Sequence, residues 1–321
     1  MKLSDHLTRE QIENLMKPSN FRGCIAVATT WMMILGSFAL LFYFPNVFTF
    51  LISLIILGGR HLALAILMHD CSHYSLFRTR RLNDWVGQWM CAYPTWQDLK
   101  RYRVHHLRHH KYAGTEDDPD IDLVRGFPTT KSSLIRKFAR DLLGITGLKR
   151  VYGLLLMDLG FIEYTVSSDV KKTLPGRYNW MGRTKLFFQT TGGMIITNFA
   201  LFLFVQTIFA SWVFWVWPLS YLTTFSLFLR IRSIAEHACT TMDIDPLKST
   251  RTTLASPIAR VTVAPHRVNY HLEHHILMNV PYFRLKKLHR LLIACPEYTK
   301  AYIAVSYLDV LKIATNNTQS S

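Results

Sequence analysis

The residues of this chain best suited to chemistry are histidines, and they are clustered. The segment Val104–Tyr112 reads VHHLRHHKY and holds four of them. If this segment is helical, His106, His109 and His110 are spaced i, i+3 and i+4, so their imidazoles lie on one side of the helix. Neutral imidazole is the commonest side-chain metal ligand. A solvated basic cluster is the alternative interpretation, but the spacing favours a metal site.

Two further clusters have the same character. The segment HDCSH places His69 and His73 at i and i+4, and HLEHH repeats the i, i+3, i+4 spacing with His271, His274 and His275. Eight of the 14 histidines therefore fall into three clusters with helical ligand spacing. Tetrahedral zinc takes four ligands, so this number of imidazoles predicts two ions. Imidazole suits iron, zinc, copper and nickel alike, and the spacing does not choose among them.

Composition places these clusters beside a membrane. The chain has 321 residues, is 50% hydrophobic and carries a net charge of +16. Because the positive charge accompanies long apolar runs, it indicates a membrane surface as the partner and argues against nucleic acid. The five cysteines form no CxxC pair, which predicts free thiols.

Four apolar runs are long enough to cross a hydrocarbon layer of ~30 Å as helices, which takes roughly 20 residues. They cover about residues 21–44, 47–68, 186–209 and 212–229, and two short turns pair them into hairpins. Neither turn contains Lys or Arg, whereas residues 75–185 and both terminal regions are rich in them. By the positive-inside rule, both termini and every histidine cluster face the cytoplasm. Arg60 and His61, inside the second run, are expected to face other helices.

The predicted fold class is an all-α integral membrane protein, with four transmembrane helices in two hairpins and a cytoplasmic helical cap that carries a histidine-rich di-metal site. The predicted domains are a polar N-terminal lead (1–20), a membrane domain (21–295) and a C-terminal tail (296–321). The stretch 142–162 is expected to lie on the membrane surface. The acidic sequence TEDDPD at 115–120 either hydrogen-bonds ligand histidines or forms a solvated loop.

Several known metal motifs are absent from the sequence, which narrows the chemistry. There is no HExxH of zinc proteases, no HxE with PCxxC of zinc deaminases, and no Glu-x-x-His pair of soluble di-iron bundles. A haem carrier needs only one or two axial histidines. A metal transporter would hold its ligands near the middle of the membrane, whereas these histidines lie at the ends of the spans.

The three clusters, read as HDCSH, HLRHH followed by DDPD, and NYHLEHH, resemble the histidine boxes of the integral-membrane fatty acid desaturases. The resemblance covers about residues 60–292. It implies a non-haem di-iron centre (Fe²⁺/Fe³⁺) that uses O₂ and two electrons to introduce a C=C bond into a fatty acyl or lipid chain. It also implies a set of metal ligands: His69, His73, His106, His109, His110, His237, His271, His274 and His275.

Residues beside these ligands are candidates for positioning them or a metal-bound water. These candidates are Asp70, Glu236, Asn269, Glu273 and His105. His105 does not match a ligand position when the second box is read as HLRHH, but it would replace His106 if the box were HxxxHH. We therefore place His105 next to the ligands and leave that choice open.

The resemblance leaves the reaction open between desaturation and hydroxylation or ketolation of an alkyl, carotenoid or sphingoid chain. A non-enzymatic membrane haem or metal carrier is a remote alternative. As the enzyme needs electrons, we expect a separate ferredoxin, rubredoxin or small cytochrome to dock on basic residues around 100–111 and 284–290. Anchoring to anionic membrane lipid would explain the same charges.

Overall fold

A computed structural model describes residues 3–167 and 170–316 of the chain. Within this part of the chain, four helices are long and apolar enough to cross a membrane, as the sequence predicts. They are α2 (Asn20–Tyr43), α3 (Val47–Ser72), α8 (Trp180–Ile208) and a broken fourth helix composed of α9 (Ser211–Phe214), α10 (Val216–Leu222) and α11 (Thr224–His237).

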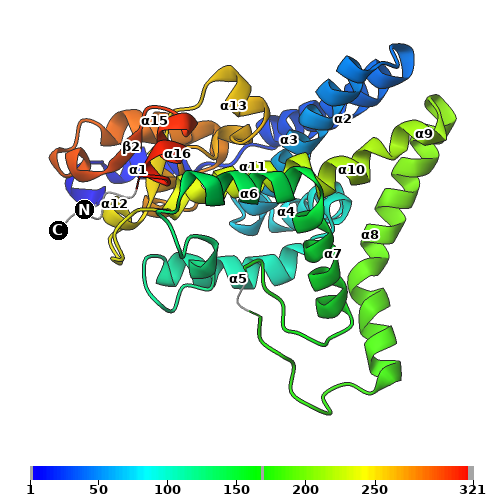
Figure 1. Cartoon of the computed structure of the whole chain (residues 1–321). Coiled ribbons are helices and arrows are strands. Elements are labelled where there is room, and N and C mark those ends of the chain that lie inside the picture. Colours follow the sequence, from blue (N-terminus) through cyan, green and yellow to red (C-terminus); the bar gives the residue numbers. More distant parts are fainter. Residues whose placement is uncertain (1–2, 168–169, 317–321) are drawn as a thin grey trace.

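The remaining elements are shorter and lie away from the tips of the α2–α3 and α8–α9 turns (Figure 1). The helices are α1 (Arg9–Met16), α4 (Arg80–Val86), α5 (Leu99–Tyr112), α6 (Lys131–Leu142), α7 (Ile145–Asp158), α12 (Pro246–Ser249), α13 (Pro257–Val261), α14 (His271–Ile276), α15 (Tyr282–Leu292) and α16 (Tyr307–Ile313). The short helical turns include η2 (Gly87–Ala92), η3 (Tyr93–Thr95), η5 (Pro265–Arg267) and η6 (Pro296–Lys300). In the described residues, strands β1 (Arg251–Thr253) and β2 (Tyr302–Ala304) form one parallel pair.

Helices α2 and α3 are joined by a turn at residues 44–46 and pack against each other. Asn46 begins α3 because its side chain accepts hydrogen bonds from the backbone N–H groups of Phe48 and Thr49. With 26 residues, α3 is roughly 39 Å long, which exceeds the ~30 Å hydrocarbon layer. It ends four residues beyond the predicted residue 68, so its last turns carry His69 out of the span.

Helix α8 begins at Trp180, earlier than the predicted residue 186. The added turn is stable because Asn179 caps it and because Arg183 donates hydrogen bonds to the carbonyls of Leu159 and Gly160 at the end of α7. These contacts pair the Arg183 guanidinium with backbone carbonyls from another part of the chain, which a hydropathy pattern does not reveal.

The fourth helix is interrupted at Trp215 and at Thr223 and runs to His237, past the predicted residue 229. Its polar end remains helical because its arginines are paired. Arg230 binds both carboxylate oxygens of Asp141 on α6, and Arg232 lies 2.6 Å from Glu236 one turn away.

Arg60 and His61 face the protein interior, as expected, and are 5% and 1% exposed. The Arg60 guanidinium donates to the carbonyl of Val261, and His61 Nε2 lies 3.1 Å from the carbonyl of Trp217. In Figure 1, the α2–α3 turn and the α8–α9 turn lie toward the upper right, and α5 lies on the far side from them.

The terminal segments pack into the same body as the short helices. Helix α1 lies against α15, with the fully buried Leu15 at this contact. At the other end, β2 pairs with β1, and α16 packs on α11. Residues 296–316, the described part of the predicted tail, therefore contact the region that carries the third histidine box.

Candidate metal centre

Three helices and the end of α11 bring histidines to one place. Helix α5 begins at Asp98, whose side chain accepts the backbone N–H of Arg101, and it packs across α3. Helix α14 has only six residues and begins at the first histidine of its box. The clusters, distant in sequence, therefore converge at the ends of the apolar helices.

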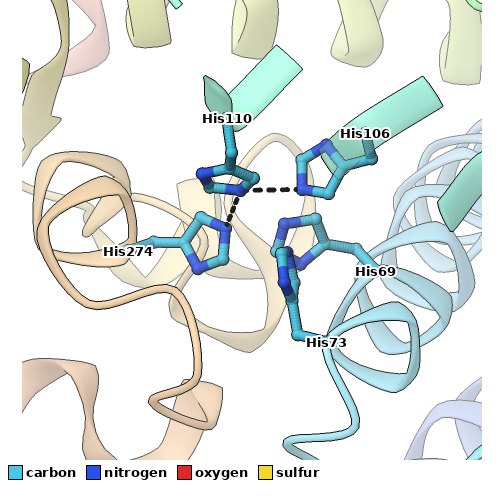
Figure 2. Close-up of side chains that lie close together, drawn as sticks. All are labelled: His69, His73, His106, His110 and His274. Carbon is cyan, nitrogen blue, oxygen red and sulfur yellow. Dashed lines mark hydrogen bonds between the residues drawn. The ribbon is translucent and has the colours of Figure 1, made fainter. Parts of the chain in front are cut away.

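In the described residues, the histidines form two groups. Within each group, the candidate ligand atoms all lie within 4.8 Å of one another. The first group is His69, His73, His106, His110 and His274, and the second is His109, His237, His271 and His275. All nine histidines predicted to bind metal belong to one of these groups. Figure 2 shows the first group, with side chains from α3, α5 and α14 pointing toward one another.

The division of the histidines follows helix geometry. Residues at i and i+4 differ by about 40° around a helix, whereas i and i+3 differ by about 60° in the opposite direction. Accordingly, His106 and His110 stay together, and His109 on the same helix joins the other group. Helix α14 repeats this division, because its i, i+4 pair lies in the second group and His274 crosses to the first.

The nitrogen atoms of the first group fit a bound cation. His110 Nε2 lies 3.0 Å from Nε2 of His106 and 2.9 Å from Nε2 of His274 (Figure 2). A neutral imidazole has only one N–H, so three converging nitrogens cannot all be paired with one another. Nε2 of His69 and both ring nitrogens of His73 are buried without a hydrogen-bond partner. Buried polar atoms rarely stay unpaired. A metal ion would satisfy Nε2 of His69 and the one nitrogen of His73 that carries a lone pair.

The second group has the same arrangement. Nε2 of His271 lies 2.8 Å from Nε2 of His237 and 3.1 Å from Nε2 of His275. Nδ1 of His237 donates to the carbonyl of Ser249 at 3.1 Å, which leaves Nε2 free to bind a metal. The residues of both groups therefore fit a pair of ions.

Electrostatics keep most of these imidazoles in the neutral form that binds metal. Burial, followed by the neighbouring histidines and cationic groups, lowers the pKa values of His106, His110, His271, His274 and His275 well below the usual range. Burial and Arg103 lower the pKa of His73 to about 3. A ligand histidine must be deprotonated, so these environments favour metal binding at neutral pH.

Carboxylates orient one histidine of the second group. Nδ1 of His109 lies 2.7 Å from Asp118 and 3.8 Å from Asp120. Burial alone lowers the pKa of His109, but these two carboxylates outweigh it and the net shift is upward. Asp118 and Asp120 thus turn inward from the acidic sequence at 115–120, whereas Glu116 and Asp117 are exposed. The sequence left two interpretations open, contact with the site histidines or a solvated loop, and each describes two of these four carboxylates.

Two of the predicted positioning residues contact histidines of the groups. Asp70 lies 3.3 Å from Nδ1 of His69, and its other oxygen accepts the backbone N–H of Tyr282 at 2.9 Å. Glu236 lies 3.5 Å from Nδ1 of His271. Both carboxylates are in the position from which such groups fix the orientation of a ligand imidazole.

The other three candidates contact different partners. His105 lies outside both groups, and its Nε2 is 2.8 Å from Asp120. The Asn269 amide donates to the carbonyl of Thr253 at 2.9 Å. Glu273 hydrogen-bonds to side chains on β1, α15 and η6.

Two contacts at the site were missed by sequence reasoning. Tyr102 stacks on His106 with ring centroids 5.1 Å apart. It lies four residues before His106, so helical spacing could have identified it. The carbonyl of Ser249 is a backbone group, and no sequence signal points to it.

Taken together, the fold and the site define a helical membrane protein with a buried pair of histidine groups that could hold two metal ions. The model of the fatty acid desaturase family matches residues 45–306. The chain therefore belongs to the fatty acid desaturase family and is an oxidoreductase.

Individual relatives are distant. Dihydrorhizobitoxine desaturase of Bradyrhizobium elkanii is 24% identical over 299 residues, which is 89% of this chain and 79% of that enzyme. An sn-1 acyl-lipid omega-3 desaturase (ferredoxin) of Synechocystis sp. is 24% identical over 79% of this chain and 70% of its own length. Beta-carotene ketolase of a Paracoccus species is 27% identical over 69% of this chain and 72% of its own length.

The contact between Asp118 and His109 yields a testable prediction. Asp118→Asn keeps the size of the side chain but removes the charge that orients and polarises the imidazole. We expect metal affinity and turnover to fall by roughly 10- to 100-fold, as at other sites where such a carboxylate is changed. Bound metal, measured by elemental analysis, and product formation would check this. The exposed neighbour Asp117 provides the control, because Asp117→Asn should retain both properties.

Proposed function

We propose that the protein is an O₂-dependent desaturase that introduces a C=C bond into a fatty acyl or lipid chain with a non-haem di-iron centre. The observation that carries the proposal is the convergence of five and four histidines into two adjacent groups at the ends of apolar helices. In this proposal, the nine histidines of these groups are the iron ligands. Imidazole ligands suit iron, and iron is the redox metal that family membership favours.

We further propose that the four spans form two hairpins, with both termini and the histidine-bearing cap in the cytoplasm. The absence of Lys and Arg from the two turns supports this orientation. The position of both turns on one side of the molecule, away from α5, also supports it (Figure 1).

Each part of the site would have a separate task in the reaction. When bound, iron supplies the oxidising power that cleaves an unactivated C–H bond with O₂. The protein holds the imidazoles in place, and Asp118, Asp70 and Glu236 orient three of them. Six of the nine histidines are buried, which would limit the access of water to the reacting atoms.

A pocket beside the first group is a suitable place for the reacting part of the chain. It is narrow, with space for about one water molecule, so the side chains around it would have to move apart to admit an alkyl segment. Its wall includes three site histidines (His69, His271 and His274), three apolar side chains (Ile66, Val268 and Leu285), and also Asp70, His266 and Tyr282. Apolar walls hold an alkyl segment, and histidines from both groups place it within reach of the metal centre.

The reaction needs two electrons, and we propose that a soluble donor protein such as a ferredoxin, rubredoxin or small cytochrome delivers them. The name of the Synechocystis relative specifies ferredoxin. In this chain, Lys100, Arg108 and Lys111 are exposed on α5, the helix that carries the second histidine box. A negatively charged donor would be attracted to this face.

Charge reversal on α5 tests the donor site. In Lys100→Glu with Lys111→Glu, we expect the KM for an acidic donor to rise by about tenfold at low salt, because rim charges act mainly on association. Turnover with a small chemical reductant should not change. The measurement is a donor titration at two salt concentrations. An unchanged KM at both would place the donor elsewhere and leave lipid anchoring as the role of these charges.

The alternative outcome is hydroxylation or ketolation of an alkyl, carotenoid or sphingoid chain, and the similarity to beta-carotene ketolase favours including it. Expression in a host lacking the protein, followed by mass analysis of total lipids, distinguishes the two. Desaturation removes two hydrogens, whereas hydroxylation adds oxygen. The His109→Ala variant should insert in the membrane but produce neither product. If the active protein gives only oxygenated products, the desaturase proposal is wrong.

A further inference from the structure

Three of the four histidines in the second group lie at the very end of a helix or on a very short one. His237 is the last residue of α11, and His271 and His275 lie on α14, which has six residues. An isolated helix of this length is not stable in water. Contacts outside these helices must therefore fix the positions of these histidines.

Strand β1 lies against both elements. It packs on α11 and on α14, and it is fully buried over its three residues. Successive side chains of a strand point in opposite directions. Arg251 and Thr252 can therefore hold a different helix on each side of β1.

On one side, the Arg251 guanidinium binds the end of α11. It is 2% exposed. It donates to the carbonyls of Ile234 at 3.4 Å, Ala235 at 3.3 Å, Ala238 at 2.8 Å and Cys239 at 3.3 Å. The last carbonyls of a helix have no partners within it, and a cation here satisfies both their hydrogen bonds and the helix dipole. Arg251 thus fixes the turn that presents His237.

On the other side, the Thr252 hydroxyl donates to Glu273, which lies between the histidines of α14 in sequence. Glu273 is completely buried and also accepts hydrogen bonds from Tyr298 on η6 and from His289 on α15. A buried carboxylate is stable only when its oxygens are satisfied, and three donors do so here. Glu273 therefore anchors α14 through contacts separate from the metal site.

The third residue of β1 fixes the approach to α14. The Thr253 N–H donates to the carbonyl of Asn269 at 3.0 Å, and the Asn269 amide donates back to the carbonyl of Thr253 at 2.9 Å. Strand β2 pairs with β1 in parallel register, Arg251 with Tyr302. The C-terminal segment therefore supplies both Tyr298 and the strand that holds β1.

We propose that β1, braced by β2 and by Tyr298, is the element that positions the four-histidine group, with Arg251, Thr252 and Glu273 as positioning residues. The first group depends on it less, because four of its five histidines lie on or at the end of α3 and on α5. The inference rests on the proposed pair of iron ions. It adds that the two iron sites differ in their main support, so that the second site can be emptied while the first still holds its ion.

The test uses full-length protein purified in detergent and compares three substitutions of buried threonines. Thr252→Val removes the hydroxyl but keeps the shape, and Thr252→Ser keeps the hydroxyl. Thr191→Val makes the same change at a completely buried threonine on α8, which contributes no histidine to either group. Tyr298→Phe removes the other hydroxyl donor to Glu273 and provides a second variant if Thr252→Val does not fold. Iron per chain is measured, together with the electron paramagnetic resonance signal after nitric oxide treatment, which reports an isolated ferrous ion.

In Thr252→Val and Tyr298→Phe, we expect iron affinity at one site to fall by about tenfold or more. The iron content should therefore fall from two ions toward one, and the isolated-ion signal should appear. Thr252→Ser and Thr191→Val should keep two coupled ions. The inference is overturned if both variants keep two ions, lose both equally, or lose no more than Thr191→Val does. A wild-type protein without a pair of ions would instead contradict the proposed function.

Discussion

In the His106→Ala variant, we expect turnover to fall below detection, whereas His105→Ala should keep a measurable part of it. His106 is 4% exposed and belongs to the five-histidine group, where its Nε2 faces that of His110 at 3.0 Å. The imidazole of His105 points instead to Asp120. Changes beside a metal site lower activity by roughly 10- to 100-fold, so loss of a ligand should exceed about 100-fold and loss of His105 should remain near 10-fold.

Product formation per unit of inserted protein, with bound iron, measures both variants. His61→Ala is a useful control, because His61 is a buried histidine of the membrane region that belongs to neither group. It tests whether the loss of any buried imidazole reduces activity through folding alone. The reverse pattern, with an inactive His105→Ala and an active His106→Ala, would mean that the second box is read as HxxxHH and that His106 is not a ligand.

The location of the site was predictable because the rules that govern it are local. Apolar runs of about 20 residues identify spans, and i, i+3, i+4 spacing places three imidazoles on one side of a helix. The inward position of Arg60 and His61 followed from the high free energy of a charge in lipid. The same reasoning predicted four apolar spans with their histidines at the span ends, and both features are present.

The distribution of histidines between the two groups was not predictable, because it depends on how α5 and α14 lie relative to each other. Helix geometry separates His109 from His106 and His110, but only the tertiary arrangement places it next to the i, i+4 pair of α14. The two HxxHH boxes exchange their middle histidines across the site. Each group of histidines therefore contains side chains from both boxes.

The supports of the site were also hidden from the sequence. Arg251 resembles an ordinary surface arginine until the carbonyl groups at the end of α11 are seen around it. Hydropathy placed the end of the fourth apolar run at residue 229. It could not reveal that α11 continues to His237, because Arg230 is paired with Asp141, 89 residues away in the sequence. Long-range pairing of charge is invisible to a sliding window.

Removal of metal should have the largest effect of all on both stability and turnover. It should also distinguish the contribution of the ions to stability from their contribution to the reaction. Chelation leaves nine imidazoles, six of them buried, with lone pairs directed at one another, which is an unfavourable arrangement. We expect the apoprotein to be inactive and to unfold at a lower temperature. A metal that binds only the folded state adds about 3 kcal/mol of stability when its free concentration is about 100 times its Kd.

Reconstitution identifies what the ions contribute. Fe²⁺ should restore both the unfolding temperature and turnover. Zn²⁺ should restore much of the unfolding temperature, because it binds imidazole well, but no turnover, because it has no redox chemistry. The measurements are thermal unfolding in detergent and product formation with O₂ and a reductant. Activity that survives chelation, or that returns with Zn²⁺, would show that the histidine groups do not act through a redox metal. If Fe²⁺ restores the unfolding temperature but not turnover, the iron ions hold α3, α5, α11 and α14 together, but the reaction does not proceed. That result would point to a missing electron donor or substrate.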